Sequence, residues 1–365
     1  MKLEMSGAEI VLQSLVDQEV EVVFGYPGGA VLPIYDTLFK QNSIKHVLVR
    51  QEGGAIHAAE GYARSTGKVG VVLVTSGPGA TNVVTGLTDA MMDSIPIVCI
   101  TGQVPQHLIG SDAFQECDTT GITRPCTKHN YLVKDPNKLS PVFHEAFTIA
   151  QDGRPGPVLI DIPKDVQFAK GTYIKKEKII IPSHRLFEPE IFRDDEKINE
   201  VVDLIAKAKK PIFYIGGGCI NSGPKASELV SQFVEMTNAP ATMTLMGLGV
   251  IGSSHPNSLG MLGMHGMYEA NMAMHECDVM VNIGARFDDR VTGRLDAFSP
   301  NSKKIHIDID ESNINKTIKV DVPLVGDVTN VLTKIIKAWK NKGLKTNSTD
   351  LKLWWDKINK WKKID

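Results

Sequence analysis

Short apolar runs alternate with amphipathic stretches along the first half of the chain. The apolar runs predict strands at Val20–Gly25, His46–Arg50, Gly70–Thr75, Ile95–Thr101 and Pro157–Ile162. The stretches between them have helical spacing and predict helices at Ile10–Val16, from about Val31, and at Gly53–Arg64, Ala80–Met92 and Pro141–Gln151. A capping box, Ser6 to Glu9, precedes the first helix. Strands that are apolar throughout and separated by helices are typical of a parallel sheet with both faces covered.

A second alternating unit begins near Asp194, after a stretch with lysines and prolines that is typical of a linker. Its strands are predicted at Pro211–Ile215, Asp278–Ile283 and Lys304–Ile309, and its helices at Ile198–Ala208 and after Pro224. A polar stretch then leads to a basic, helical tail whose tryptophans need a packing partner. We therefore predict an α/β protein with two doubly wound parallel-sheet domains, 1–168 and 194–340, a linker at 169–193 and a connector at 341–365.

The composition is that of an ordinary soluble globular protein. The chain has 365 residues, enough for two domains, with 42% hydrophobic and 22% charged residues. Its net charge of -2 gives no reason to expect nucleic acid or a membrane as a partner, and no run approaches the roughly 20 apolar residues of a membrane helix. The five cysteines form no CxxC pair, which favours reduced thiols and argues against a structural zinc site. No signal or transit peptide opens the chain, so we expect a cytoplasmic protein.

Glu52 is the strongest candidate for chemistry. It follows an apolar run and stands directly before Gly53 and Gly54, which open a predicted helix. The edge where parallel strands give way to their crossover helices is where ligands bind in open α/β sheets. The helix N-terminus favours an ionised carboxylate, whereas burial favours the protonated form. A carboxyl group placed between these influences suits proton exchange with a bound cofactor.

Strand ends in the second half of the chain carry glycine or charge. Gly216–Gly218 follows a strand, where backbone amides can approach a phosphate, although such a turn can also be only a tight connection. Asp308 and Asp310 end another strand, where a carboxylate can accept from ribose hydroxyls or simply be solvated. Together with the charged segment after Ile283, these strand ends favour a bound nucleotide more than any one of them does.

That charged segment, Gly284–Arg290, combines two guanidinium groups with two carboxylates. Guanidinium groups bind phosphate through paired hydrogen bonds, so the segment suits recognition of phosphates and polar rings. The alternative is internal pairing, of Arg286 with Asp289 and of Arg290 with Asp288.

Other candidate motifs are weaker. Ser76–Asn82 is similar to a phosphate cradle but lacks the Gly-Lys-Ser/Thr ending of a P-loop, which disfavours ATP chemistry. His57 lies off the helical face of Glu52, and we predict a packed histidine there. No nucleophile-elbow pattern supports a hydrolase triad.

Taken together, these stretches closely resemble the large catalytic subunits of biosynthetic, FAD-containing bacterial acetohydroxyacid synthases (acetolactate synthases). The matching motifs are VFGYPGGAVLPIYD (23–36), VRQEGGAIHAAEGYAR (49–64), VTSGPGATN (74–82), TGQVP (101–105), DAFQE (112–116), GRPGPV (153–158), IPKD (162–165), LGMLGMHG (259–266), GARFDDRVTG (284–293) and HIDID (306–310). They occur in order over essentially the whole chain.

The resemblance implies a thiamine diphosphate enzyme with a pyrimidine-binding first domain and a Rossmann-like, FAD-binding central domain. Its substrates are pyruvate and 2-oxobutyrate, its glutamate hydrogen-bonds N1′ of the cofactor aminopyrimidine, and its flavin has no net redox role. The residues assigned to thiamine diphosphate and the reaction centre are Glu52, Gly28, Gly29, Pro78, Asn82, Gln115 and Lys164. The residues assigned to FAD are Arg154, Gly216, Gly217, Gly218, Leu262, Gly263, Met264, His265, Gly266, Arg286, Asp289, Arg290, Val291, Asp308, Ile309 and Asp327.

The chain departs from the family pattern in two places. Gln51 and Gly53 flank the glutamate where the family usually has His and Gln. The Gly-Asp-Gly motif of the family's third, diphosphate-binding domain, which supplies the Mg²⁺ ligands, does not occur; Gly326-Asp327 continues with Val328. The chain thus looks like a truncated or split catalytic subunit that is inactive alone.

The partners implied by the resemblance are a second copy of the subunit, in a homodimer or tetramer, and a small regulatory subunit. One alternative is a non-catalytic FAD- or NAD-binding module or regulatory partner, which the missing motif supports and the Glu52 region opposes. A flavin or nicotinamide oxidoreductase is a weaker alternative, because the sequence has neither a redox dyad nor a complete GxGxxG.

Overall fold

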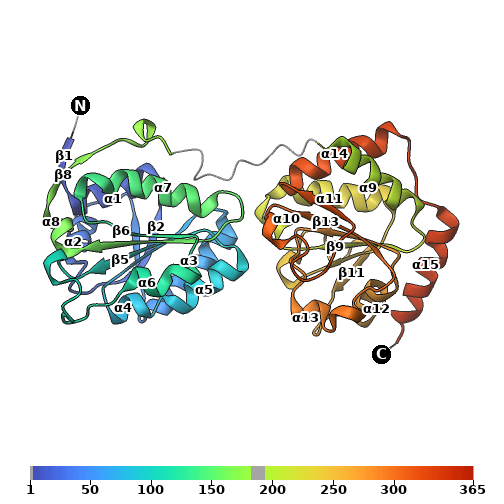
Figure 1. The fold of residues 1–365 in the computed structure, drawn as a ribbon, viewed down its shortest axis with the longest axis horizontal. Helices are drawn as coiled ribbons and strands as arrows, with labels where there is room; N and C mark the ends of the chain where they lie inside the picture. Colours follow the sequence, from blue (N-terminus) through green and yellow to red (C-terminus); the bar gives the residue numbers. More distant parts are fainter. Residues whose placement is uncertain (1–2, 182–193, 365) are drawn as a thin grey trace. The chain divides into compact units, whose positions relative to one another are not determined.

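The computed structural model describes residues 3–181 and 194–364, which belong to two compact units, Met1–Glu188 and Pro189–Asp365 (Figure 1). Each unit contains a six-stranded parallel sheet with helices on both faces. The predicted fold class, two doubly wound α/β domains, is therefore confirmed.

The unit 1 sheet has the strand order β3-β2-β4-β5-β7-β6. Its strands are β2 (Val22–Tyr26), β3 (Lys45–Leu48), β4 (Gly70–Val74), β5 (Ile97–Gln103), β6 (His129–Leu132) and β7 (Pro157–Pro163). Every residue of the three strands β4, β5 and β7 is buried, which explains why these strands are apolar throughout rather than alternating.

Two helical layers cover this sheet. One layer contains α1 (Gly7–Asp17), α2 (Leu32–Phe39), α7 (Leu139–Gln151) and α8 (Lys164–Phe168), and the other contains α3 (Glu52–Thr66), α4 (Pro78–Thr81), α5 (Val84–Asp93) and α6 (Thr119–Thr123). The predicted capping box forms, since the Ser6 amide donates to the Glu9 carboxylate over 2.7 Å and the Glu9 amide donates to Ser6 Oγ over 3.3 Å. The helix predicted at 80–92 is interrupted between α4 and α5, at Asn82 and Val83.

A small antiparallel pair of strands completes unit 1. The strand β8 (Lys170–Tyr173) pairs with β1 (Leu3–Ser6), with Leu3 opposite Tyr173. The predicted linker, 169–193, therefore differs from the structure at its start, where the chain is still part of unit 1. Its sequence, KGTY, has no apolar run, so nothing local indicates a strand; pairing with β1 decides it. The rest of the predicted linker includes 182–193, which lies outside the described residues.

The unit 2 sheet has the strand order β11-β10-β9-β12-β13-β14. Its strands are β9 (Pro211–Ile215), β10 (Ala241–Met243), β11 (Ser258–Met261), β12 (Val279–Ile283), β13 (Lys303–Asp308) and β14 (Val322–Val325). Its helices are α9 (Asp195–Lys207), α10 (Gly218–Asn221), α11 (Pro224–Thr237), α12 (Tyr268–Glu276), α13 (Asp289–Thr292), α14 (Val328–Asn341) and α15 (Ser348–Trp361). Counted from its first strand, this is the order 3-2-1-4-5-6 of dinucleotide-binding domains.

The C-terminal helix α15 packs into unit 2 beside α12, so the predicted connector is largely part of the domain. Its buried residues recur at helical spacing: Leu351, Trp354, Ile358 and Trp361. The Trp354 indole donates to the Pro211 carbonyl over 3.2 Å, which gives this tryptophan the packing partner that the sequence requires.

In the described part of the chain, no helix has both the length and the apolar character needed to cross a membrane. All five cysteines are free thiols, as predicted.

Candidate functional site

Three loops meet at the carboxyl edge of the unit 1 sheet. They follow β2, β3 and β4, which are neighbours in the order β3-β2-β4. The chain reverses its winding direction between β2 and β4, because β3 lies to one side of β2 and the later strands to the other. Such a switch point is where open α/β sheets bind ligands. It brings together the Gly28-Gly29 turn, Glu52 and the Pro78–Asn82 segment, as the sequence predicts.

Glu52 is the first residue of α3 rather than the end of a strand. Gln51 caps the helix, because its side chain accepts from the Gly54 amide over 3.0 Å. The Asn82 side-chain amide donates to Glu52 Oε2 over 2.8 Å, and the two residues are 30 positions apart in the chain. The other carboxylate oxygen of Glu52 makes no hydrogen bond to a described residue. Asn82 thus fixes the carboxylate of this half-buried residue and leaves its other oxygen available to a ligand.

The Gly28-Gly29 turn is held by a threonine that the sequence analysis did not single out. Thr75 Oγ1 accepts from the Ala30 amide over 3.2 Å, and a methyl group at Gly28 would lie 2.5 Å from Thr75 Cβ. Gly28 is therefore required by packing. A methyl group at Gly29 would meet nothing within 4 Å, so the fold does not require that glycine. The sequence feature that could have indicated a role for Thr75 is its position, because it is a polar residue directly after the apolar strand β4.

Gln115 lies against the turn that follows β4. Its backbone φ is 59°, and a methyl group at Gly77 would lie 2.5 Å from its carbonyl oxygen. Lys164 begins α8 directly after β7 and is half-buried at the same edge of the sheet. The residues assigned to the reaction centre therefore all come from loops at this edge of unit 1.

The equivalent edge of unit 2 is organised by backbone contacts. β9 and β12 are adjacent at its switch point, and the loops after them touch. The Gly216 amide donates to the Ile283 carbonyl over 2.8 Å, and the Gly218 amide donates to the Gly284 carbonyl over 3.0 Å. A methyl group at Gly216 would lie 2.2 Å from the Gly284 oxygen. Gly217 is half-buried, and its amide has no acceptor among the described residues. Gly216 and Gly218 therefore join the loop after β9 to the loop after β12, and Gly217 offers a backbone amide to a ligand.

A second pair of FAD-assigned segments also meets in unit 2. The Met264 amide donates to the Arg290 carbonyl over 2.7 Å, and the Asn271 side chain bonds both the amide and the carbonyl of Gly263. These contacts fix the Leu262–Gly266 turn against the start of α13. A cavity of about 210 Å³ lies beside them and is lined by Leu262, Asn271 and Val291 among others.

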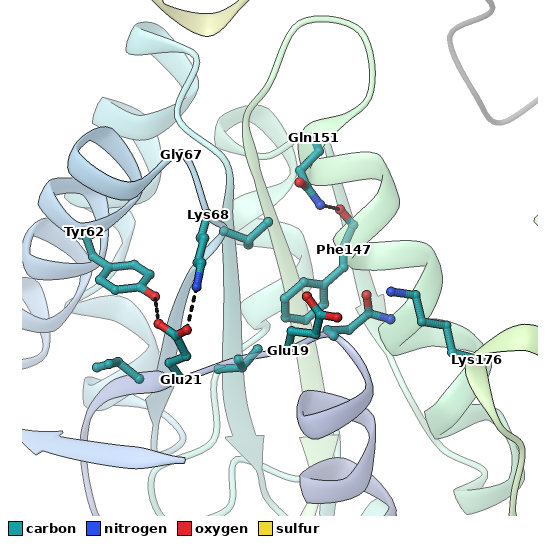
Figure 2. A pocket seen from close by; sticks show the side chains of 12 residues that line it. Glu19, Glu21, Tyr62, Gly67, Lys68, Phe147, Gln151 and Lys176 are labelled. Carbon is teal, nitrogen blue, oxygen red and sulfur yellow. Dashed lines mark hydrogen bonds and ion pairs between the residues drawn. The ribbon is translucent and has the colours of Figure 1, made fainter. Parts of the chain in front are cut away.

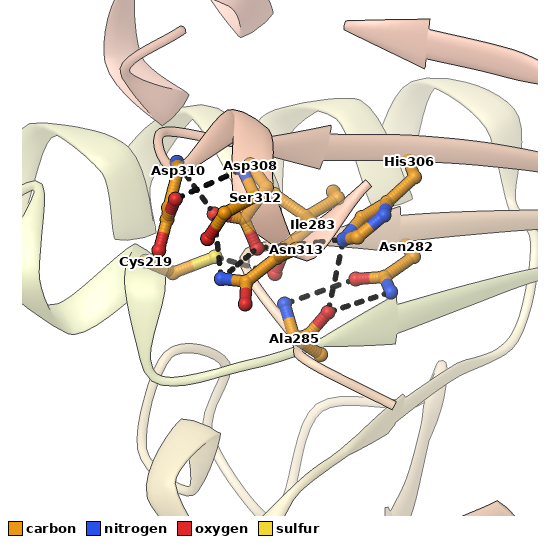
Figure 3. A network of polar contacts seen from close by, with 9 residues as sticks. All are labelled: Cys219, Asn282, Ile283, Ala285, His306, Asp308, Asp310, Ser312 and Asn313. Carbon is orange, nitrogen blue, oxygen red and sulfur yellow. Dashed lines mark hydrogen bonds and ion pairs between the residues drawn. The ribbon is translucent and has the colours of Figure 1, made fainter. Parts of the chain in front are cut away.

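A polar network links the ends of β12 and β13 (Figure 3). His306 Nε2 lies 3.0 Å from the Ala285 carbonyl and 3.4 Å from the Asp308 carboxylate. Asp308 also accepts from the Asp310 amide over 2.8 Å and from the Asn313 side chain over 3.3 Å. The buried Asp308 carboxylate therefore holds the loop that follows β13 in place through these hydrogen bonds. Asp327, at the next strand end, similarly caps α14.

The charged segment after β12 does not form the ion pairs that the sequence analysis considered. Arg290 Nε lies 3.9 Å from Asp289, whereas Asp288 accepts from the Arg290 backbone amide as the cap of α13. Arg286 makes no ion pair or hydrogen bond with any residue of the described ranges. Arg290 and Asp289 have side chains that are 68% and 79% exposed. Internal pairing in this segment is therefore limited to the long, exposed contact between Arg290 and Asp289.

Two predicted residues have surroundings that the sequence did not indicate. Arg154 lies in unit 1, where its guanidinium group donates to Ser94 Oγ over 2.8 Å and to the Met91 carbonyl over 3.1 Å, at the end of α5. The prediction that His57 is packed is wrong: the side chain is half-exposed and bonds Glu60 over 2.7 Å. Glu60 is buried, and its desolvation raises the pKa of its carboxyl group.

A polar pocket of about 250 Å³ lies at the opposite edge of the unit 1 sheet, where β2 and β4 begin (Figure 2). Within it, Lys68 lies 2.6 Å from the Glu21 carboxylate, to which the Tyr62 hydroxyl donates over 3.2 Å. None of the residues assigned to the site lines this pocket. The carboxyl edge therefore remains the candidate site.

Comparisons with known proteins identify both units. The family described as "Thiamine pyrophosphate enzyme, N-terminal TPP binding domain" matches residues 5–122, and the family described as "Thiamine pyrophosphate enzyme, central domain" matches residues 198–335. The first contains Glu52, Asn82 and Gln115, and the second contains the glycine turn after β9. The two matched regions fall in units 1 and 2, respectively.

Curated relatives are similar along nearly the whole chain. The acetolactate synthase large subunit of Buchnera aphidicola subsp. Schizaphis graminum is 51% identical over 99% of this chain, and that of Haemophilus influenzae is 50% identical over 98%. The acetolactate synthase isozyme 3 large subunit of Escherichia coli is 48% identical over 98%. The chain spans 62% of the length of each of these relatives. It belongs to the thiamine pyrophosphate enzymes, as a homologue of acetolactate synthase large subunits.

Proposed function

We propose that these residues form the first two domains of an acetolactate synthase large subunit. The reaction joins pyruvate to a second pyruvate or to 2-oxobutyrate, with loss of carbon dioxide, and gives 2-acetolactate or 2-aceto-2-hydroxybutyrate. The observation that carries the proposal is Glu52 at the switch point, held by Asn82 through one oxygen and open at the other. The relatives' shared name and their identity of about half support the choice of reaction.

The residues of unit 1 fit an aminopyrimidine ring. A ring nitrogen needs one positioned carboxyl group with which to share a proton, and the second oxygen of Glu52 offers this at the N-terminus of α3. Thiamine diphosphate, when bound, supplies the nucleophilic carbon and takes up the electrons released by decarboxylation. Glu52 holds or exchanges the proton at the ring nitrogen, and Asn82 orients the carboxylate. Gln115, Gly29 and Lys164 line the approach of the 2-oxo acids.

Unit 2 fits the diphosphate and ribose groups of FAD. The open Gly217 amide and the exposed Arg290 provide hydrogen-bond donors and positive charge at a dinucleotide-type switch point. The same features suit the alternative of a non-catalytic FAD- or NAD-binding module. A non-catalytic module would not require a carboxylate held by Asn82 at the edge of unit 1, so the Glu52–Asn82 pair favours the enzyme.

Magnesium and the partner chains belong to the same proposal. The Gly-Asp-Gly motif that supplies magnesium ligands in this family is not among the 365 residues. We therefore expect acetolactate formation only where another polypeptide segment supplies those ligands, in a homodimer or tetramer that binds a small regulatory subunit.

A colorimetric acetolactate assay tests the proposal. The 365-residue chain is assayed with pyruvate, thiamine diphosphate, Mg²⁺ and FAD, alone and in an assembly that includes the diphosphate-binding segment. We expect product only in the assembly. Product from the chain alone would overturn the assignment of the magnesium ligands, and its absence from an assembly that binds both cofactors would overturn the proposed reaction.

A further inference from the structure

A buried carboxylate lies below the candidate site in unit 1. Asp161, on β7, has only 1% of its surface exposed. Its two oxygens have different partners: Thr101 Oγ1 donates to Oδ1 over 2.7 Å, and Gln103 Nε2 donates to Oδ2 over 2.9 Å. A buried charge is costly unless it is hydrogen-bonded, so these two donors on β5 are what the carboxylate requires.

Gln103 connects this carboxylate to the loop above it. Its side-chain nitrogen also donates to the Cys117 carbonyl over 2.8 Å, while its side-chain oxygen accepts from the Val104 amide over 2.9 Å. Because the Val104 contact comes from an N–H group, the orientation of the amide is fixed, and the nitrogen must face Asp161 and Cys117. Gln103 is 3% exposed and has no alternative partner in water.

The loop that Gln103 holds is the loop that carries Gln115. Within it, the Glu116 carboxylate collects the amides of Gly110 and Ala113, and Asp118 caps α6 by accepting from the Gly121 amide over 2.9 Å. These contacts shape the loop but do not attach it to the sheet. Asn130 on β6 attaches the α6 end, because its side chain donates to the Thr120 carbonyl over 2.7 Å. Gln103 attaches the loop to β5 at Cys117, which is two residues after Gln115.

We propose that Asp161 and Gln103 are positioning residues, which set the place of Gln115 at the reaction centre through Cys117. The inference rests on the proposed function, in which Gln115 lines that centre. Asp161 holds the amide of Gln103, Gln103 holds the loop, and the loop places Gln115 against the turn after β4. Neither positioning residue touches Glu52, Asn82 or the Gly28-Gly29 turn through any hydrogen bond given by the structure.

The test compares three variants in the assembly that forms acetolactate. Asp161→Asn keeps the shape and the acceptor for Gln103, and Thr101 can accept from the new amide. Asp161→Ala leaves the Thr101 hydroxyl and one N–H of the Gln103 amide buried without their acceptor, although the other N–H keeps the Cys117 carbonyl. Gln103→Leu removes the contact with the Cys117 loop itself. Small displacements of positioned groups can cost about 100-fold in rate. We therefore expect kcat to fall by about 10- to 100-fold in Asp161→Ala and Gln103→Leu, and by less than about threefold in Asp161→Asn.

A second readout separates positioning from general damage and from failure of the proposed function. Exchange of the C2 proton of bound thiamine diphosphate depends on Glu52, so it should stay near the wild-type rate in all three variants. The matched control is Asn257→Ala, which removes a buried amide that donates to the Ala239 carbonyl over 3.0 Å in unit 2; it should leave both readouts unchanged.

The proposal is overturned if Asp161→Ala retains wild-type kcat, if Asp161→Asn is as impaired as Asp161→Ala, or if proton exchange falls together with turnover. If Asp161→Ala does not fold, Gln103→Leu and Asp161→Asn decide the matter by the same criteria. Absence of C2 exchange in the wild type would instead contradict the proposed function.

Discussion

The carboxyl edges of the two sheets prepare their sites in different ways. In unit 1, side chains bond other side chains: Asn82 holds Glu52, and Gln103 links Asp161 to the loop of Gln115. In unit 2, the ends of β9 and β12 are joined by backbone contacts of the glycines that follow β9, while the Arg290 side chain is largely exposed. Both candidate sites lie at a switch point of their sheet. In unit 1, hydrogen bonds hold individual side-chain atoms in place, whereas in unit 2 they hold the backbone of two loops together.

The difference follows from what each proposed ligand needs. A proton transferred at a single ring nitrogen requires one carboxyl oxygen in one place, which neighbouring side chains must hold. A dinucleotide is bound over a long surface by amides and cations, so close backbone approach matters more than the position of any one side chain. The loss of one group should therefore cost most in unit 1.

The largest effect is expected at Glu52. Glu52→Gln should lower acetolactate formation by about 100- to 10,000-fold, the usual contribution of acid–base groups. The fold and FAD affinity should not change, because the amide retains the size of the side chain and unit 2 is a separate domain. Exchange of the C2 proton of bound thiamine diphosphate measures the loss directly. Wild-type exchange in this variant would remove Glu52 from its proposed role.

In unit 2, Arg290→Ala should weaken FAD binding by about 10- to 100-fold, because a hydrogen bond to a charged group contributes about 1.5–3 kcal/mol. Flavin fluorescence titration measures the dissociation constant. Arg294→Ala is the matched control, since Arg294 is an exposed arginine that is already paired with Asp296 at 2.7 Å. Equal losses in the two variants would show a general charge effect rather than a contact of Arg290.

The two glycine turns should respond differently to a methyl group. Gly216→Ala should destabilise unit 2 by about 1–3 kcal/mol, because the new methyl group would overlap the Gly284 carbonyl and force the strand ends apart. Gly29→Ala should leave stability unchanged, because the position is open. Denaturant unfolding of both variants checks this. An unchanged Gly216→Ala would mean that the backbone contact is not what orders this edge.

The smallest effect concerns pH and Asp161. Burial raises the pKa of this carboxyl group to about 7, with Asp118 raising it further and Thr101 and Gln103 opposing the rise. The folded state therefore holds a proton that the unfolded state has released, so this group's contribution to stability falls as pH rises from about 4 to 7 and is then constant. The other titratable groups affected by it are Cys99 and Cys117, whose thiol pKa values are raised by burial and by Asp161.

Asp161→Asn cannot titrate and should remove this slope. The gain in stability over the wild type should be larger at pH 8 than at pH 5, by on the order of 1 kcal/mol. Unfolding curves at the two pH values measure the difference. The same gain at both pH values would show that Asp161 does not change its charge on unfolding in this range.

The sequence by itself determined the alternation of strands and helices, the two domains and the strand ends that carry the candidate site residues. These depend on local periodicity and on the rule that parallel strands end at one edge, so the sequence alone predicted that Glu52, Gly28 and Gly216–Gly218 lie at the edges of the sheets. The pairing of β8 with β1 and the packing of α15 were not found as domain structure, because neither segment specifies its partner.

Only the tertiary structure decided how the site residues are held. Asn82 meets Glu52 across 30 positions, and Gln103 meets Asp161 across 58. Thr75 supports the Gly28 turn from the next strand of the sheet. A polar residue in a sequence shows that it needs a hydrogen-bond partner once buried, but strand order and loop conformation select the partner. The sequence therefore determined which residues lie at the edge, and the fold determined which of them hold the others in place.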